Sequence, residues 1–322
     1  MCRAPGAAQV PFRDLAALLG AFEALPAERA KRMLVIANRA GGFVKEFPAG
    51  PGIASPNWQY FIPAVGCPAN CRYCFLQAYH PAGAPVIFTR QEDMLHEIEA
   101  RAREAAGGYF YGGELCDNLM LEDYLQLAGP LVAMFRRLPG STLELRTKSD
   151  CIEALTAAGA IPNVVISFTL TPEEAARRME EGTAPVAARI DAARRLQRAG
   201  FTVGLRLDPI VLTCGWQGSY ERLMDRVSRE LAASQIESVH LGCMRYPPAL
   251  KSKAMLHEQP SLPFVGEFVS SGDGKFRYPR PLRLAAYARI AGLVRAWDTR
   301  IPVRLVMEPE RMSADLRRLL AQ

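Results

Sequence analysis

Three cysteines stand close together in the first quarter of the chain: Cys67, Cys71 and Cys74 are separated by three and then by two residues. Thiolates bind soft metals and iron–sulfur clusters, so this spacing points first to metal chemistry. Three ligands in so short a loop can wrap one face of a cubane cluster and leave its fourth iron open. That open iron could bind and reduce a ligand, which is the chemistry that the spacing predicts.

Two other interpretations of these cysteines stay open. A structural zinc site would need a fourth ligand to close it, and His80 is the nearest candidate. The cysteines could instead be ordinary core residues. Eight cysteines in 322 residues are too sparse for a disulfide scaffold. In a reducing compartment, clustered cysteines indicate metal ligands first.

Repeated β–α units are expected to position the cysteine loop. Apolar segments of β type alternate with amphipathic helices, which favours an α/β fold with a parallel sheet covered by helices. The expected strands are 58–65, 108–111, 142–147, 163–169, 202–207 and 236–242. The expected helices lie near 88–106, 119–137, 150–158, 185–199 and 219–233.

The two ends of the chain depart from this alternation. Residues 14–38 have apolar side chains at helical spacing, and the Gly- and Pro-rich stretch 41–56 indicates a loop. The pattern breaks into loop again near 250–280, before a helix at 281–298 and a short strand at 302–307. We therefore expect an N-terminal helical extension, residues 1–56 with a helix over 14–38, and one domain, residues 57–322, with a C-terminal closing segment.

Several polar residues fall at or near the ends of the predicted strands. They are residues 112–114, Lys148, Ser167 and residues 206–208. Active sites of β/α barrels gather at the C-terminal ends of the strands. These residues could therefore converge on one mouth.

Composition sets further limits. The net charge of +6 is compatible with nucleic acid or another anionic partner without demanding one. No apolar run approaches the roughly 18 residues needed to cross a membrane, and the first 20 residues lack the layout of a secretory signal. We therefore expect a cytoplasmic protein that has no membrane partner.

The cysteine spacing, with aromatic Tyr73 just before the third cysteine, resembles the signature of radical S-adenosylmethionine enzymes. The resemblance implies a partial (β/α)6 TIM-like barrel and a 4Fe–4S cluster on Cys67, Cys71 and Cys74. It also implies that S-adenosylmethionine is cleaved reductively and that the 5′-deoxyadenosyl radical abstracts a substrate hydrogen. An electron donor such as flavodoxin or ferredoxin would supply the electron.

A Gly-Gly-Glu segment, Gly112 to Glu114, agrees with this resemblance. In the superfamily such a segment often accepts hydrogen bonds from the ammonium group of the cofactor. The physical reason is that glycines allow close backbone approach while a carboxylate pairs with a cation.

Within the superfamily, the chain resembles spore photoproduct lyase and its relatives, from about Gly42 to Trp216 and more loosely to Tyr278. The stretches that carry the resemblance are 62–77, 146–148, Ser167 in the strand 164–169, 181–185 with Arg189, 208–210 and 215–216. The resemblance implies that Lys148 and Ser167 contact the cofactor. The cofactor-binding residues predicted in this way are Tyr73, Gly112, Gly113, Glu114, Lys148 and Ser167.

Two departures from the lyase pattern concern the radical chemistry. The lyase motif usually has tyrosine on both sides of the third cysteine, but Phe75 stands on the far side here. A phenol can pass a hydrogen atom whereas a phenyl ring cannot, so only Tyr73 could do so. The nearest match to the hydrogen-donating cysteine of the lyase is Cys116. Tyr73 and Cys116 are the predicted catalytic residues, and Cys116 could equally be an apolar filler.

The substrate is left open between DNA and a small molecule, nucleoside or peptide, and a zinc-binding nucleic-acid module is a third alternative. Basic residues of the C-terminal loop region, interleaved with aromatic ones, could grip a strand and stack an extruded base. They are Lys251, Lys253, Lys275, Arg277 and Arg280, with Phe276 and Tyr278 between them. A solvated loop that closes the barrel mouth is the alternative for this region.

Overall fold

The computed structural model describes residues 15–23, 25–47, 57–80, 83–104, 107–255, 262–264 and 266–321. Its largest element is an eight-stranded sheet in the order β16-β12-β11-β9-β8-β7-β3-β2. Six of these strands follow one another along the chain and run parallel, which confirms the predicted α/β fold with a partial barrel of six units. They are β3 (Trp58–Phe61), β7 (Tyr109–Gly112), β8 (Thr142–Thr147), β9 (Val164–Thr169), β11 (Thr202–Ile210) and β12 (Ile236–Cys243).

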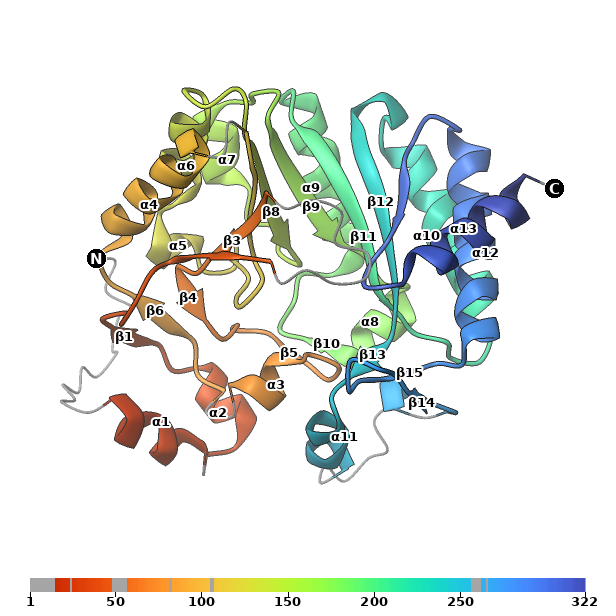
Figure 1. Cartoon of the computed structure of the whole chain (residues 1–322), viewed down its shortest axis with the longest axis horizontal. Helices are drawn as coiled ribbons and strands as arrows, with labels where there is room; N and C mark the ends of the chain where they lie inside the picture. The colour runs from red at the N-terminus through yellow and green to blue at the C-terminus, as the bar shows by residue number, and fades with distance from the viewer. Residues whose placement is uncertain are drawn as a thin grey trace.

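The two edges of this sheet are formed by the ends of the chain. Strand β16 (Val303–Leu305) lies parallel to β12, and β2 (Val44–Glu46) lies antiparallel to β3. In the part of the chain that the structure describes, β2 and β16 do not pair with each other, so the barrel is open on one side. The strands stand in the middle, with α4, α6 and α7 on one flank and α10 and α12 on the other (Figure 1).

The inner face of the barrel is polar because side chains alternate along each strand. On β8, Leu143 and Leu145 are buried in the hydrophobic core. Glu144 and Arg146, which alternate with them, face the opposite side, and Arg146 lines a cavity there. The sheet therefore has one apolar face covered by helices and one charged face that is available for chemistry.

The helices of the barrel lie close to their predicted positions. They are α4 (Gln91–Glu104), α5 (Glu122–Leu125), α6 (Ala128–Phe135), α7 (Glu153–Ala158), α9 (Val186–Arg198), α10 (Trp216–Glu230) and α12 (Arg280–Trp297). The helix predicted near 119–137 is divided into α5 and α6, because Gln126 adopts a left-handed conformation with φ of 50°. None of the described helices has the length and apolar character needed to cross a membrane.

The single helix predicted for residues 14–38 is wrong. The described residues form α1 (Leu15–Glu23) and α2 (Ala27–Lys31), followed by strand β1 (Val35–Ala37), which pairs with β6 (Val86–Phe88). Pro26 precedes α2 with an extended ψ of 137°, and a proline cannot donate a helical hydrogen bond inside a continuous helix. The loop predicted for 41–56 contains β2, while residues 48–56 lie outside the described residues.

The loop predicted near 250–280 is also partly wrong, because a three-stranded sheet forms there. Strand β15 (Phe276–Arg277) pairs with both β13 (Arg245–Tyr246) and β14 (Val269–Ser270). The remaining elements are short or close the chain: β4 (Ala64–Val65), β5 (Asn70–Cys71), α3 (Leu76–Tyr79), α8 (Glu173–Met179), β10 (Glu180–Glu181), α11 (Pro248–Met255), α13 (Glu310–Leu320) and the 3₁₀ helices η1 (Ala233–Gln235) and η2 (Leu262–Phe264).

Candidate active site

A cavity of about 1590 Å³ opens along the charged face of the sheet. The loop that carries the three cysteines forms one wall, and the ends of β7, β8 and β11 form another. Residues of β16 and α13 contribute to the remaining side, where the barrel is open. The strand-end residues Glu114, Lys148, Arg206 and Asp208 all line this cavity, as their positions in the sequence predicted.

The cysteine loop begins at Gly66, which needs a left-handed φ of 85°. A side chain at this position would lie 3.0 Å from the Ala84 carbonyl oxygen, so glycine is required for packing as well. The Gly66 amide donates a 2.8 Å hydrogen bond to the carbonyl of Leu115, just beyond β7. The start of the loop is thus attached to the segment that contains Glu114.

The rest of the loop is held by a distant part of the chain. Strand β5 pairs with β10 and places Cys71 opposite Glu180, and the Arg72 amide donates to the Met179 carbonyl at 2.8 Å. The Gln77 side chain also donates to the Cys71 carbonyl at 2.7 Å. These contacts fix a short loop so that all three cysteines face one cavity.

The three cysteines fit a cluster with three protein ligands. All three thiols are free and line the same cavity wall. Burial, with Asp117 and Cys74 nearby, raises the pKa of Cys67 to about 12. Burial also raises the pKa of Cys71 well above its usual value. Thiolates in this setting need a compensating positive charge, which bound iron would provide.

The zinc alternative finds no fourth ligand in His80. Its Nε2 atom lies 2.7 Å from the Ala84 carbonyl oxygen, in a hydrogen bond that belongs to the packing around Gly66. Across the described ranges, no three His, Cys, Asp or Glu side chains form a group that could hold a single metal ion.

Tyr73 joins the cysteine loop to a buried ion pair. Its hydroxyl donates to the Glu180 carboxylate, which also forms a 2.7 Å ion pair with the Arg189 guanidinium. Both side chains of this pair are completely buried. The ammonium of Lys148 lies 5.6 Å from the centre of the Tyr73 ring, so Tyr73 and Lys148 stand side by side on the cavity wall.

The Gly-Gly-Glu segment makes a tight turn at the end of β7. Gly113 has a φ of 105°, and a side chain there would lie 2.9 Å from the Arg146 carbonyl oxygen. Glu114 follows with its carboxylate on the cavity wall, where it accepts a 2.7 Å hydrogen bond from the Tyr111 hydroxyl. Gly112 lies behind the wall, packed against Phe61.

Asp117, which the sequence analysis did not select, links the Glu114 and Lys148 segments. Its buried carboxylate accepts hydrogen bonds from the backbone amides of Lys148 (2.7 Å) and Met120 (3.1 Å) and from the Thr147 hydroxyl (2.8 Å). Burial acts to lower the pKa of Lys148, but electrostatic attraction to Cys71 and Glu180 acts more strongly in the other direction. The pKa of Lys148 is therefore raised. The Lys148 ammonium therefore stays charged beside the cysteines.

Ser167 is buried behind the wall of the cavity. It is 2% exposed and is not among the residues that line the cavity. Its hydroxyl hydrogen-bonds to Glu144 and fills the space that a side chain at Gly204 would occupy. The structure thus brings Tyr73, Gly113, Glu114 and Lys148 to the cavity, and leaves Gly112 and Ser167 behind its wall.

A family model described as spore photoproduct lyase matches residues 17–259, about three quarters of the chain. This chain belongs to the spore photoproduct lyase family. It is accordingly a radical S-adenosylmethionine enzyme of the lyase-like type, with S-adenosylmethionine and a 4Fe–4S cluster as its cofactors.

Curated relatives in this family are distant in sequence. The spore photoproduct lyase of Clostridium acetobutylicum is 25% identical over 238 residues, which cover 70% of this chain and 70% of that protein. The spore photoproduct lyase of Bacillus subtilis is 25% identical over 183 residues, which cover 55% of this chain and 53% of that protein.

Solved structures of spore photoproduct lyase share the fold. One, complexed with dinucleoside spore photoproduct, has a TM-score of 0.75 at 17% identity and covers 87% of this chain and 84% of its own. A mutant with bound AdoMet and dinucleoside spore photoproduct has a TM-score of 0.73 at 16% identity and covers 92% and 86%.

Cys116 and Phe75, the two positions at which the chain departs from the lyase pattern, both border the cavity. Cys116 borders the cavity but is only 4% exposed, and its thiol donates to the Asn118 side-chain oxygen at 3.0 Å. Phe75 lies on the cavity wall with its ring edge-on to Tyr79, at 5.9 Å between centres. The thiol is thus engaged elsewhere, and no hydroxyl is present at position 75.

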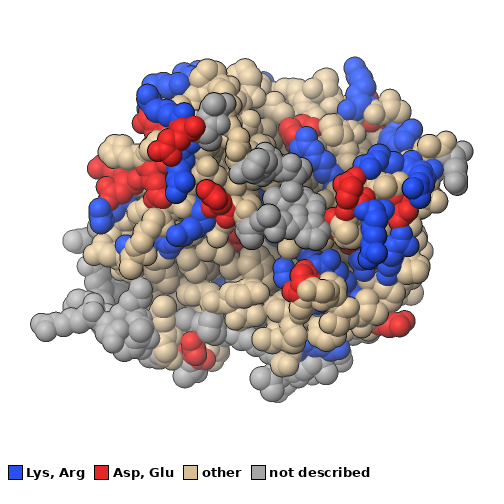
Figure 2. Space-filling view, viewed as in Figure 1, with Lys and Arg blue, Asp and Glu red and all other residues tan. Residues whose placement is uncertain are grey.

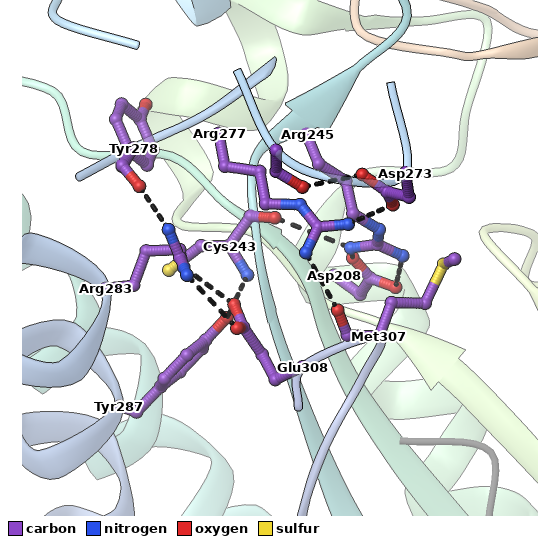
Figure 3. A network of polar contacts seen from close by, with 11 residues as sticks. Asp208, Cys243, Arg245, Asp273, Arg277, Tyr278, Arg283, Tyr287, Met307 and Glu308 are labelled. Atoms are coloured by element: carbon purple, nitrogen blue, oxygen red, sulfur yellow. Dashed lines mark hydrogen bonds and ion pairs between the residues drawn. The ribbon is translucent and has the colours of Figure 1, made fainter. Parts of the chain in front are cut away.

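The C-terminal closing segment is held in place by a polar network (Figure 3). Glu308 accepts hydrogen bonds from Arg283 (2.8 Å) and Tyr287 (2.9 Å), and Arg277 donates to the Met307 carbonyl at 3.2 Å. Met307 lines the cavity, so these contacts support its wall.

The prediction that Arg277 and Tyr278 could grip a nucleic-acid strand is wrong. Arg277 is 6% exposed, and Tyr278 is 3% exposed with its hydroxyl bonded to the Leu212 amide. Lys275 does line the cavity, whereas the side chain of Lys253 lies outside the described residues. Tyr278 is buried against Phe268 and cannot stack a base, and the partly buried Phe276 stacks on Tyr246 in the small sheet.

Proposed function

We propose that Cys67, Cys71 and Cys74 hold the 4Fe–4S cluster and that S-adenosylmethionine binds beside them, between Glu114 and Lys148. When bound, these groups supply a 5′-deoxyadenosyl radical that takes a hydrogen atom from the substrate. The observation that carries this proposal is that three free thiols, a carboxylate and an ammonium line one cavity.

The protein's own residues would bind and orient the cofactor. Glu114 carries the charge that pairs with the cofactor's ammonium group, and Lys148 carries the charge that pairs with its carboxylate. Asp117 keeps these two segments in register through its bonds to the Lys148 and Met120 amides. Tyr73 packs beside Lys148 and gives the cofactor an aromatic wall. Gly112 and Ser167 support this wall from behind.

For the substrate, we propose a pyrimidine photoproduct of DNA. The support is that related structures hold dinucleoside spore photoproduct and that the cavity exceeds the volume of a usual single-ligand pocket. Lys and Arg side chains also gather beside the cavity, over the region of α13 (Figure 2). Arg317 and Arg318 there are 67% and 79% exposed, and they form exposed ion pairs with Glu310 (2.7 Å) and Asp315 (3.6 Å) that a phosphate would have to compete with.

Under this proposal the Cys116 thiol leaves Asn118 and gives its hydrogen atom to the product radical, which leaves the unpaired electron on the Cys116 sulfur. The bond to Asn118, together with Phe75, favours a second candidate function. In that alternative the same radical chemistry acts on a small molecule, nucleoside or peptide, and Cys116 is part of the core. Fold and cofactor are shared by both alternatives, so only the substrate separates them.

We also propose that the protein is cytoplasmic and is reduced by a donor such as flavodoxin or ferredoxin. The seven cysteines in the described residues are all free thiols, as is usual in a reducing compartment. The proposed division of the chain is an extension, residues 1–56, and a catalytic unit, residues 57–322. The six parallel strands all lie within the second part.

The test is an anaerobic reconstitution followed by product analysis. We expect one 4Fe–4S cluster per chain and 5′-deoxyadenosine on reduction with S-adenosylmethionine. With a dinucleotide photoproduct we expect repaired dinucleotide. Formation of 5′-deoxyadenosine without any repair would exclude the DNA substrate and support the second candidate, and stoichiometric zinc with no iron would refute both.

A further inference from the structure

Three charged side chains meet on the inner face of the barrel: Glu144 and Arg146 of β8 and Arg206 of β11. The Arg206 guanidinium binds Glu144 through two hydrogen bonds, of 2.8 and 2.9 Å. Arg146 donates a third, at 3.1 Å, and the Tyr109 hydroxyl a fourth, at 3.0 Å. The Ser167 hydroxyl also hydrogen-bonds to Glu144, so one carboxylate serves two guanidinium groups and two hydroxyls.

The charge of this cluster is not balanced by Glu144 alone, and Glu114, which also acts on Arg146, is the proposed partner of the cofactor's ammonium. Burial disfavours the charge on Glu144, but Arg146 and Arg206 lower its pKa well below the usual value, so the carboxylate is ionised. His240 stands beside Arg206, and burial together with Arg206 lowers its pKa to about 2, so it is neutral. Two guanidinium charges and one carboxylate leave a net charge of +1 on the cavity wall.

The neighbouring carboxylates already have partners. Asp208 is paired with Arg245 at 2.8 Å (Figure 3), and Glu237 is paired with Arg304 at 2.8 Å. Glu114 accepts from Tyr111 and is the proposed partner of the cofactor's ammonium. A buried charge without a partner is costly, so an anion that enters this cavity would remove that cost.

Arg146 is the member of the cluster that is prepared to bind such an anion. Its guanidinium carbon lies 3.6 Å from the centre of the Tyr111 ring, and the bond to Glu144 fixes its other side. Its Nε–H group is buried and has no hydrogen-bond partner among the described residues. The side chain lines the same cavity as the three cysteines.

We propose that Arg146 and Arg206, held by Glu144, form a subsite for an oxyanion of the substrate. This rests on the proposed function, because the subsite shares the cavity of the cofactor. A guanidinium with free donors suits phosphate or carboxylate. In a DNA substrate the oxyanion is the phosphodiester between the two nucleosides. In a small-molecule substrate it is a phosphate or carboxylate on that molecule.

The experiment measures binding of three probes to the anaerobically reconstituted protein by calorimetry. The probes are thymidylyl-thymidine, which carries one phosphodiester, a dithymidine with a neutral linkage, and succinate. The variants are Arg146→Met, Arg146→Lys and, as a control that removes an arginine of β16 on another side of the same cavity, Arg304→Met. Thermal unfolding of each variant shows that it is folded.

We expect the dissociation constant of an anionic probe to rise about ten- to a hundredfold in Arg146→Met, the usual effect of losing a charged hydrogen bond. Arg146→Lys keeps the charge and should recover part of this loss, while Arg304→Met should stay within about twofold of wild type. Dependence on Arg146 for the phosphodiester but not for the neutral dithymidine identifies phosphate as the ligand. The same dependence for succinate alone identifies a carboxylate. If the wild type binds no anionic probe, or if Arg146→Met binds it as tightly, the subsite does not exist.

Cofactor binding separates this inference from the proposed function. If the wild type holds the cluster and binds S-adenosylmethionine but Arg146 does not affect the probes, only the subsite is refuted. If the wild type holds neither cofactor but binds the probes through Arg146, the proposed function is refuted and the subsite stands.

Discussion

The buried pair of Glu180 and Arg189 allows a quantitative test of how the cysteine loop is supported. Arg189→Met removes the guanidinium while keeping a side chain of similar length. Glu180 would then be left as a buried carboxylate beside the Tyr73 hydroxyl and opposite Cys71 in the β5–β10 ladder. We expect both global stability and the order of the cysteine loop to suffer.

The size of the effect follows from the contacts of Arg189. It pairs with Glu180 at 2.7 Å with both side chains completely buried, and it donates to the carbonyls of Ala184 (2.8 Å) and Thr169 (2.9 Å). Breaking a buried pair by removing one partner costs about 3–5 kcal/mol. At roughly 2 °C per kcal/mol for a chain of this size, Tm should fall by about 6–10 °C.

The assay is thermal unfolding of the reconstituted protein, with iron content measured on the same samples. The control is Arg177→Met, which removes an exposed i,i+4 pair with Glu173, with 69% of the Arg177 side chain exposed. Exposed pairs contribute about 0–1 kcal/mol, so Tm should change by no more than about 2 °C. We also expect Arg189→Met to retain less iron than wild type, because β10 holds β5 and Cys71.

A pH series adds a second readout. Burial disfavours ionised Glu180, but Arg189 and Lys148 lower its pKa below the usual value, so this carboxylate stabilises the fold above its unfolded pKa. That stability is lost as pH falls through the folded value. In Arg189→Met the loss of folding stability at acid pH should be smaller than in wild type, because Arg189 no longer lowers the pKa of Glu180 in the folded state. A Tm within 2 °C of wild type at neutral pH, with full iron content, would refute the reasoning.

Three further predictions concern the site itself. Replacing Cys67, Cys71 or Cys74 by Ala should remove most of the iron and all cleavage of S-adenosylmethionine, measured by iron analysis and 5′-deoxyadenosine formation; retention of both would contradict the ligand assignment. Glu114→Ala should weaken S-adenosylmethionine binding about ten- to a hundredfold by calorimetry while the cluster spectrum is unchanged, and equal affinity would show that Glu114 is not a contact. Glu144→Gln should cost about 3–5 kcal/mol at neutral pH in denaturant unfolding. Because the pKa of Glu144 is lowered on folding, wild type should lose this difference as pH falls below about 4; a difference that does not depend on pH would contradict this.

The sequence predicted most strands and helices of the barrel because the spacing of apolar residues within each segment indicates its secondary structure. A strand such as β9 is a short apolar run, and a helix such as α9 buries residues at helical spacing. Both patterns depend only on neighbours along the chain. The prediction failed where a single residue interrupts such a pattern, as Pro26 does between α1 and α2.

The candidate site could be predicted in part for a similar reason. Strand ends of a parallel barrel meet at one side, so Glu114 and Lys148 could be expected near the cysteines. Asp117 was missed because its role depends on amides of another strand. An acidic residue three positions after the Gly-Gly-Glu turn gives no signal of that role in the sequence.

The sequence by itself determined the α/β class and the family, and it supplied the proposed ligand set, because cysteine spacing and β–α alternation are properties of short segments. Tertiary structure alone decided that Cys116 bonds to Asn118, that Ser167 lies behind the cavity wall, and that β10 holds β5 from more than 100 residues away. It also decided that Glu144 and Arg206 meet, 62 residues apart. The direction and partner of a side chain depend on strands that pair only in the folded chain, and local periodicity carries no information about that pairing.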